Sequence, residues 1–366
     1  MKLFSMPADF NNETIDGYAG LNEKYPESKV IETYGNISVD SLFASGRAES
    51  LIPGIDLEKF ADYIEHSKKN NIQFNYTFNP PTIQNQEFKP EGINRIKELL
   101  KILSDLDIFS ITVSIPSLIE VVKYLDDRFK IRASTICSIT TVNEALAFKR
   151  MGVDKIVVKE SINRKFDTLK AIVDNFGDEV EVITNVICHQ TCIYRVFHYL
   201  QDSFDKGNKE WGYDYYLTRC VQRMINDPVS VLKFSWIRPE DIHKYEEIGI
   251  KYFKVQGRQS ILKGEPVKMV EHYFQESFEG DLMKLLWMFS STHKTGFKVD
   301  NKKLDKFLTP FVKNDNFCSD NCVDCKYCYE YAKKCFEGID NIKYTQDFLN
   351  SSRFDGFKAF FEKNNK

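Results

Sequence analysis

The feature that most constrains the fold is an alternation of short apolar runs with longer amphipathic stretches over the first 260 residues of this 366-residue chain. Within the longer stretches, apolar residues recur at three- and four-residue spacing, which predicts helices. The predicted strands are residues 3–6, 30–34, 72–78, 108–113, 131–136, 155–158, 180–186 and 252–255. The predicted helices are residues 57–70, 92–106, 116–125, 141–151, 166–175 and 239–248.

Eight strands separated by helices predict an α/β fold, a TIM-type (β/α)8 barrel. A doubly wound open sheet is the alternative, but no G-x-G-x-x-G follows the first strand, which removes its commonest dinucleotide-binding form. A strand-like run at residues 231–237 interrupts the alternation. We therefore predict a barrel over residues 1–260 and a cysteine-rich C-terminal extension over residues 261–366 that packs on it.

Charge and hydropathy indicate the compartment and the kinds of partner to expect for this chain. No segment resembles a signal peptide, and no apolar run approaches the roughly 18 residues that cross a bilayer, so we expect a cytoplasmic protein with no membrane partner. A formal net charge of -3 does not support a nucleic-acid partner, because such proteins are usually basic. Cytosolic thiols stay reduced, so the nine cysteines are predicted to bind metal or to catalyse rather than to form disulfides.

Five of the cysteines crowd the C-terminal part of the chain: Cys318, Cys322, Cys325, Cys328 and Cys335. The first four follow the spacing C-x3-C-x2-C-x2-C, and such a compact run can supply the thiolates of a 4Fe–4S cluster. Structural zinc sites usually draw on two well-separated C-x2-C pairs. We expect an iron–sulfur cluster here, with zinc as the less favoured alternative and plain thiols as the third.

A second cysteine group begins directly after a predicted strand. Cys188 and Cys192 form a C-x3-C pair beyond residues 180–186, where the C-terminal end of a barrel strand faces the catalytic rim. Two small buried hydrophobes on one helical turn are the alternative, but Arg195 and His198 follow at helical spacing, which an apolar core turn would not tolerate. The pair is predicted to bind metal, with Cys220 as a third ligand.

Polar side chains that end predicted strands, or lie in the loops after them, are candidates for the substrate site at the barrel mouth: Tyr34, Arg47, Asn79, Lys159 and Asn185. Arg258 ends the last strand beside Gly257, which lets the backbone bend, and its guanidinium suits a carboxylate or phosphate. His198 is the acid–base candidate, because imidazole titrates near neutral pH. We predict catalytic roles for His198, Arg195 and Arg258; the alternatives are solvated loop charges and a hydrogen-bonded helix histidine.

Three parts of the chain resemble the collagenase-like peptidase U32 family. They are the cysteine-bearing segment 185–199, the segment 234–241 with Tyr-Phe-Lys-Val-Gln-Gly-Arg at 252–258, and Phe-Asn-Tyr-Thr-Phe-Asn-Pro at 74–80 with Asn85 and Glu87. The resemblance covers about residues 1–265. It implies a barrel with a 4Fe–4S cluster at its mouth and a chemistry other than proteolysis, since members hydroxylate ubiquinone precursors, tRNA or ribosomal RNA without oxygen.

The sequence departs from the family pattern in three respects. Gln256 replaces the usual acid before Gly-Arg, the spacing from Cys188 to Cys220 is not that of the ubiquinone proteins, and the C-terminal cysteine run is additional. These departures leave the substrate open. They also favour a second 4Fe–4S cluster.

We therefore expect an iron–sulfur enzyme that carries out oxygen-independent hydroxylation or a related redox or group-transfer reaction. A small molecule, with a carboxylate-bearing compound as one candidate, would be the substrate, and an electron donor or partner protein would assist. A peptidase, or a non-catalytic electron-transfer or scaffold protein, is the alternative. The chain has no H-E-x-x-H and no G-x-S-x-G, and the adjacent Cys188 and His189 would point apart on a helical turn.

Overall fold

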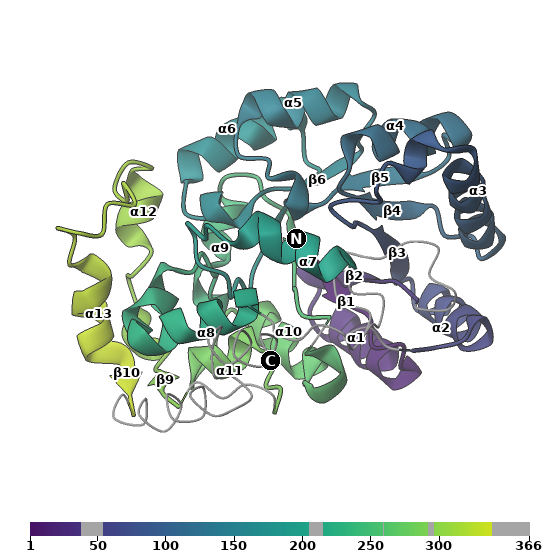
Figure 1. The fold of residues 1–366 in the computed structure, drawn as a ribbon. Coiled ribbons are helices and arrows are strands. Elements are labelled where there is room, and N and C mark those ends of the chain that lie inside the picture. The colour runs from purple at the N-terminus through teal and green to yellow at the C-terminus, as the bar shows by residue number, and fades with distance from the viewer. Residues whose placement is uncertain (38–53, 205–214, 259, 292–295, 339–366) are drawn as a thin grey trace, which may run out of the picture.

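The computed structural model describes residues 1–37, 54–204, 215–258, 260–291 and 296–338. Eight parallel strands pair in chain order and close into a barrel, because β1 pairs with both β2 and β8 (Figure 1). The strands are β1 Lys2–Pro7, β2 Ser28–Gly35, β3 Gln73–Phe78, β4 Ser110–Val113, β5 Lys130–Ala133, β6 Lys155–Val157, β7 Val180–Ile183 and β8 Tyr252–Lys254. The predicted (β/α)8 barrel is confirmed.

Helices surround the strands: α1 Asn12–Lys24, α2 Leu57–Lys69, α3 Pro90–Asp105, α4 Pro116–Leu125, α5 Val142–Arg150 and α6 Phe166–Phe176. Side chains fix several helix starts. Asp56 accepts a hydrogen bond from the backbone N–H of Lys59, and Thr141 and Glu144 form a reciprocal capping box at the start of α5. Helix α1 was not predicted.

The stretch between β7 and β8 differs from the prediction. It contains α7 Arg195–Phe204, α8 Tyr215–Asn226, the 3-10 turn η5 Pro228–Lys233, the 3-10 turn η6 Pro239–Asp241 and the single-turn helix α9 His243–Glu246. The strand-like run at residues 231–237 forms no strand. A closed barrel offers no free edge, so this run gives one backbone hydrogen bond to the barrel, from Ile237 N–H to the Thr184 carbonyl at 2.8 Å.

The barrel interior carries charge where barrels of this class usually hold branched apolar side chains. The Arg132 guanidinium forms a buried ion pair with Glu32 and lies 3.5 Å from a carboxylate oxygen of Glu181. The Ser5 hydroxyl lies 2.7 Å from both carboxylates. Burial alone would raise the pKa of Glu32, but the Arg132 guanidinium outweighs burial and holds that pKa at about 2. The interior is therefore a linked polar network.

The rest of the described chain packs against the barrel. It contains α10 Pro266–Phe274, α11 Leu282–Leu286, the 3-10 turn η8 Lys302–Leu304, α12 Thr309–Lys313 and α13 Tyr327–Cys335, with a two-stranded antiparallel sheet of β9 Lys298–Val299 and β10 Phe336–Glu337. Aromatic contacts join it to the barrel: the rings of Phe4 and Phe274 lie 5.4 Å apart, and those of Trp236 and Phe307 lie 5.5 Å apart. One apolar core thus runs through barrel and extension. None of the helices in the described ranges has the length and hydrophobicity needed to span a membrane.

Candidate active site at the barrel mouth

A small cavity of about 60 Å³ opens at the C-terminal ends of the strands. Three residues predicted for the substrate or catalytic site line it: Tyr34, Asn79 and Arg258. Its other polar lining residues, which the sequence analysis missed, include Lys254, Thr77 and Tyr199. The cavity volume corresponds to only a few water molecules, so it fits a small compound or one end of a larger one.

Arg258 is held rigidly in the cavity wall. Its Nη1 donates to Asn36 Oδ1 at 2.7 Å and to Thr77 Oγ1 at 2.9 Å, and the residue is buried. Gly257 takes a φ of +137°, a conformation that favours glycine, and so turns the chain sharply just before the arginine. The guanidinium is therefore preorganised for an anionic group in the cavity.

Lys254 lies at the end of β8 and is only 8% exposed. Its Nζ lies 3.2 Å from the centre of the Tyr34 ring and makes no hydrogen bond to any residue that the structure describes. The Tyr34 hydroxyl donates to the Val255 carbonyl at 2.7 Å, which fixes the ring. Burial lowers the pKa of Lys254 to about 7, although the Glu181 carboxylate opposes the shift.

Two of the predicted substrate residues, Asn185 and Lys159, are not among the residues that line the cavity. Asn185 is buried and donates from Nδ2 to the carbonyls of Gln256 at 2.7 Å and Leu286 at 2.9 Å, so it ties β7 to β8 and α11 instead of lining the cavity. Lys159 follows β6 at the barrel rim but is not among the residues around the cavity. Arg47 lies outside the described residues.

Arg195 has a structural partner. Its guanidinium forms an ion pair with the Glu160 carboxylate, both side chains are at least nine-tenths buried, and Glu160 also accepts from Thr135 Oγ1 at 3.0 Å. Thr135 lines the cavity, so the pair fixes α7 to the barrel rim. The catalytic role of Arg195 stays a prediction, and what the structure shows is its guanidinium in an ion pair with Glu160.

His198 is not among the residues that line the cavity. Its Nε2 lies 3.9 Å from Asp202 Oδ1, and its ring faces that of Tyr216, with 6.2 Å between the ring centres. The next residue, Tyr199, lines the cavity instead. Successive residues of a helix point in different directions, so α7 directs Tyr199 inward and His198 aside.

Cys188, Cys192 and Cys220 come together beside this cavity, and all three are partly buried. Burial raises the pKa of Cys220 to about 12, and the thiols of Cys188 and Cys192 add to the shift. Cys188 packs against a small apolar cluster that contains Val157 and Ile183, and both of these residues line the cavity. The predicted first cysteine group therefore adjoins the candidate substrate site.

The second group lies in the extension, from the loop after α12 into the first turn of α13. Burial raises the pKa of Cys328 to about 11; the Arg164 guanidinium opposes the shift, and Cys318 and Cys322 add to it. Cys322 and Cys325 are exposed.

Cys335 is separate from that group, since it ends α13 and is fully buried in the apolar core, with Asp300 and Lys303 as its charged neighbours. The structure thus gathers four of the five predicted C-terminal ligands at most.

All nine cysteines are free thiols, as a metal-binding protein requires. Within the described ranges, no group of three or more His, Cys, Asp or Glu side chains is arranged to hold a single metal ion. A single zinc ion needs its ligands on one small tetrahedron. A four-iron cube places each thiolate on a separate iron, so it suits thiols that are neighbours without meeting at one point. The choice of an iron–sulfur cluster over zinc stays a prediction.

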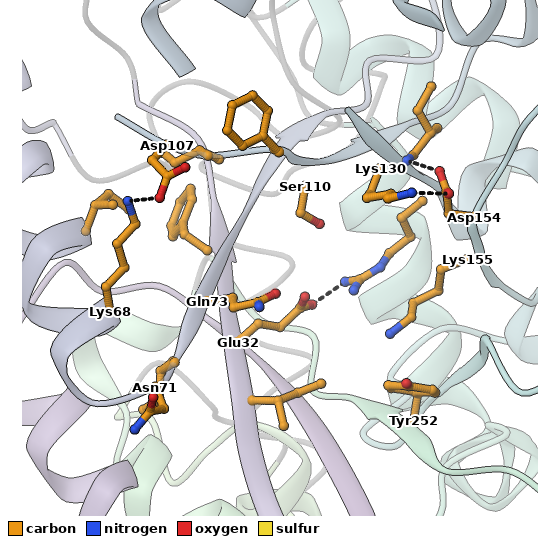
Figure 2. Close-up of a pocket in the computed structure, with 18 of the residues that line it drawn as sticks. Glu32, Lys68, Asn71, Gln73, Asp107, Ser110, Lys130, Asp154, Lys155 and Tyr252 are labelled. Carbon is orange, nitrogen blue, oxygen red and sulfur yellow. Dashed lines mark hydrogen bonds and ion pairs between the residues drawn. The ribbon is translucent and has the colours of Figure 1, made fainter. Parts of the chain in front are cut away.

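A larger cavity of about 990 Å³ lies at the opposite end of the barrel, where the strands begin (Figure 2). Its lysines have carboxylate partners: Lys68 pairs with Asp107 at 2.9 Å, Lys130 with Asp154 at 3.5 Å and Lys155 with Glu179 at 3.0 Å. The N-terminal face of such barrels serves stability, and active sites lie at the C-terminal face. We therefore assign the active site to the smaller cavity.

Fold and site together define a (β/α)8 barrel protein with a cationic mouth cavity and a cysteine group beside it. A sequence model described as peptidase family U32 matches residues 54–192. A Methanocaldococcus jannaschii protein named an uncharacterized protease is 26% identical over 338 residues, which is 90% of this chain and 97% of the relative. The solved structure of a U32 peptidase matches with a TM-score of 0.50 and 18% identity, covering 70% of this chain and 94% of that one. These comparisons support the predicted resemblance of the chain to peptidase family U32.

Proposed function

We propose that the chain is an iron–sulfur enzyme that acts on a small molecule at the barrel mouth, by oxygen-independent hydroxylation or a related redox or group-transfer reaction. The observation that carries the proposal is the position of Cys188, which packs on the cavity-lining residues Val157 and Ile183. Cys188, Cys192 and Cys220 would hold a 4Fe–4S cluster. When bound, such a cluster would supply electrons and a Lewis-acidic iron next to the substrate.

The chain's own residues would bind and orient the substrate. The Arg258 guanidinium in the cavity wall suits a carboxylate-bearing compound. The ion pair between Arg195 and Glu160 holds the helix that follows the cysteine pair against the barrel rim. The ion pair would thus hold the cysteine segment in a fixed position relative to the substrate cavity.

A second cluster in the extension, held by Cys318, Cys322, Cys325 and Cys328, completes the proposal. The exposure of Cys322 and Cys325 suits exchange of electrons with a donor protein at the surface. The nine free thiols suit a reducing compartment such as the cytoplasm.

A peptidase is the second candidate. The family description and the name of the Methanocaldococcus jannaschii relative favour it over the iron–sulfur reaction. A cysteine peptidase needs a thiol with a lowered pKa beside a base. Burial instead raises the pKa of Cys137, the cysteine nearest the strand ends outside both groups, to about 12, and its Sγ lies 3.4 Å from the Ser114 carbonyl. The site therefore lends the peptidase reaction little geometric support.

Anaerobic purification with iron, sulfide and zinc counting tests the proposal directly. We expect a brown protein with iron and sulfide well in excess of one cluster per chain, and no cleavage of casein or gelatin. A colourless protein with stoichiometric zinc would overturn the iron–sulfur reaction. Casein cleavage that disappears in Cys188→Ala would establish the peptidase instead.

A further inference from the structure

The amine of Lys254 is unusual in its surroundings. It is buried at the cavity wall, it lies on the face of the Tyr34 ring, and it makes no hydrogen bond to any described residue. A buried nitrogen left without a hydrogen bond is costly, so such a group persists in a fold when something else requires it. The residue lies in register with Ser5 of β1 and Ile183 of β7, which fixes its backbone in the barrel wall.

We propose that Lys254 is a covalent catalytic residue that forms an imine with the carbonyl carbon of a small 2-oxo acid, whose carboxylate Arg258 binds. Both side chains line the same cavity, and its volume of about 60 Å³ limits the compound to a few heavy atoms. A guanidinium fixed by Asn36 and Thr77 recognises the carboxylate, while the amine faces the adjoining carbonyl.

The step balances without an oxidant or reductant. The Lys254 nitrogen adds to the carbonyl carbon, its two protons leave with the carbonyl oxygen as water, and a carbon–nitrogen double bond remains. The nitrogen must be uncharged to add. Burial beside the cationic Arg132 and Arg258 favours the uncharged amine, against the opposing carboxylates of Glu181 and Glu32. Desolvation of a lysine in this way is an established route to a nucleophilic amine.

The other end of the barrel supplies a matched control. Lys155 also lies on an aromatic face, with its Nζ 3.3 Å from the centre of the Tyr252 ring (Figure 2). It differs in having a carboxylate partner, Glu179, at 3.0 Å. Lys155 therefore separates the effect of an aromatic neighbour from that of a buried amine that has no hydrogen bond to any described residue.

The test is reductive trapping in the anaerobically purified full chain. Pyruvate and cyanoborohydride are added near neutral pH, and the modified lysines are located by peptide mass spectrometry. We expect carboxyethylation mainly at Lys254, its loss in Lys254→Met and in Lys254→Arg, and its retention in Lys155→Met. Acetone, which lacks the carboxylate, should label Lys254 roughly tenfold less or worse, and Arg258→Met should abolish that preference.

The wild-type map alone is decisive, even if a variant fails to fold. Labelling spread evenly over surface lysines, or none at Lys254, would overturn the proposal, and equal labelling by pyruvate and acetone would overturn the carboxylate part. The inference rests on the proposed function only in sharing its cavity. Iron counting on the same preparation therefore tests the iron–sulfur proposal separately from the imine proposal. Trapping without iron would support the imine and overturn the iron–sulfur reaction. Iron without trapping would support the iron–sulfur reaction and overturn the imine.

Discussion

Arg195 of α7 and Glu160 at the end of β6 form an ion pair that the protein buries almost completely. The pair lies between the cysteine segment that precedes α7 and Thr135, which lines the mouth cavity. Two opposite charges buried away from water attract each other strongly, but a buried charge destabilises the fold when its partner is removed. The position of the cysteine group relative to the cavity therefore depends on this contact.

Removing one partner should destabilise the protein. We expect Glu160→Ala to lower the free energy of unfolding by about 3–5 kcal/mol, because it leaves a buried guanidinium without its counter-ion. Urea unfolding with circular dichroism measures the change. The exposed pair of Lys170 and Asp174, 2.8 Å apart, gives the control, since Lys170→Ala should cost less than about 1 kcal/mol. Equal effects of the two variants would show that burial of the Arg195 pair contributes nothing.

The two cysteine groups should respond differently to single substitutions. Cys192→Ala should lose part of the iron and leave the barrel folded, because the eight strands do not depend on that loop. Cys325→Ala should lose the other part and loosen the extension, since a cluster would supply folding free energy to a segment in which Cys322 and Cys325 are exposed. Iron counting and limited proteolysis near residues 300–338 measure both effects. Loss of all iron in either variant would mean that the groups share one cluster.

The interior ion pair predicts a loss of stability in acid. Glu32 has a pKa of about 2 in the folded protein against 4.5 when unperturbed, because the Arg132 guanidinium outweighs the effect of burial. A carboxylate with a lowered folded pKa stabilises the fold above its unfolded pKa and loses that contribution as pH falls toward the folded one. The stability difference between wild type and Glu32→Gln should thus be largest above pH 4.5 and shrink toward pH 2. Urea midpoints across this range measure it, and a constant difference would contradict the assignment.

Lys254 predicts a second rise of stability with pH, in a higher pH range than that of Glu32. Burial lowers its pKa from 10.5 to about 7, so between these values the unfolded chain binds more protons than the folded one, and stability rises with pH. Relative to Lys254→Met, the wild type should gain up to about 1.4 kcal/mol per pH unit within that window. Urea unfolding at intervals from neutral pH upward measures the gain. A flat difference would mean that the amine is protonated in the folded protein.

The sequence predicted the eight strands and the barrel because apolar periodicity is a local property. The strands are largely buried on both faces and appear in the sequence as short apolar runs. Most helices bury one face, which gives apolar residues at three- to four-residue spacing. The strand prediction was wrong for a segment whose apolar side chains are buried by contacts with distant parts of the chain. Residues 231–237 are as apolar as a strand, but the closed barrel has no edge for them, and they pack as a 3-10 turn and an extended run.

For the candidate site, the sequence identified Tyr34, Asn79 and Arg258, because strand ends in a barrel meet at one rim. It missed Lys254, although that residue stands in the strand-end segment that carries the family resemblance. A lysine on a strand usually reaches solvent, and only the closed barrel shows that this one points inward against Tyr34. Alternation along β8 could have indicated it, since Tyr252 and Lys254 share a face.

The sequence by itself therefore determined the fold class, the grouping of the cysteines and the rim on which polar strand ends would meet, because these follow from periodicity and spacing along the chain. The tertiary structure decided which charges pair and which remain unpaired. Arg195 pairs with Glu160, which is 35 residues away in the sequence, and Arg132 pairs with Glu32, which is 100 residues away. Cys335 is buried in the core, apart from the other four C-terminal cysteines. Arg132 on β5 meets Glu32 on β2 across the interior of the closed barrel, although these two strands do not pair, and no local pattern of the sequence encodes such a contact.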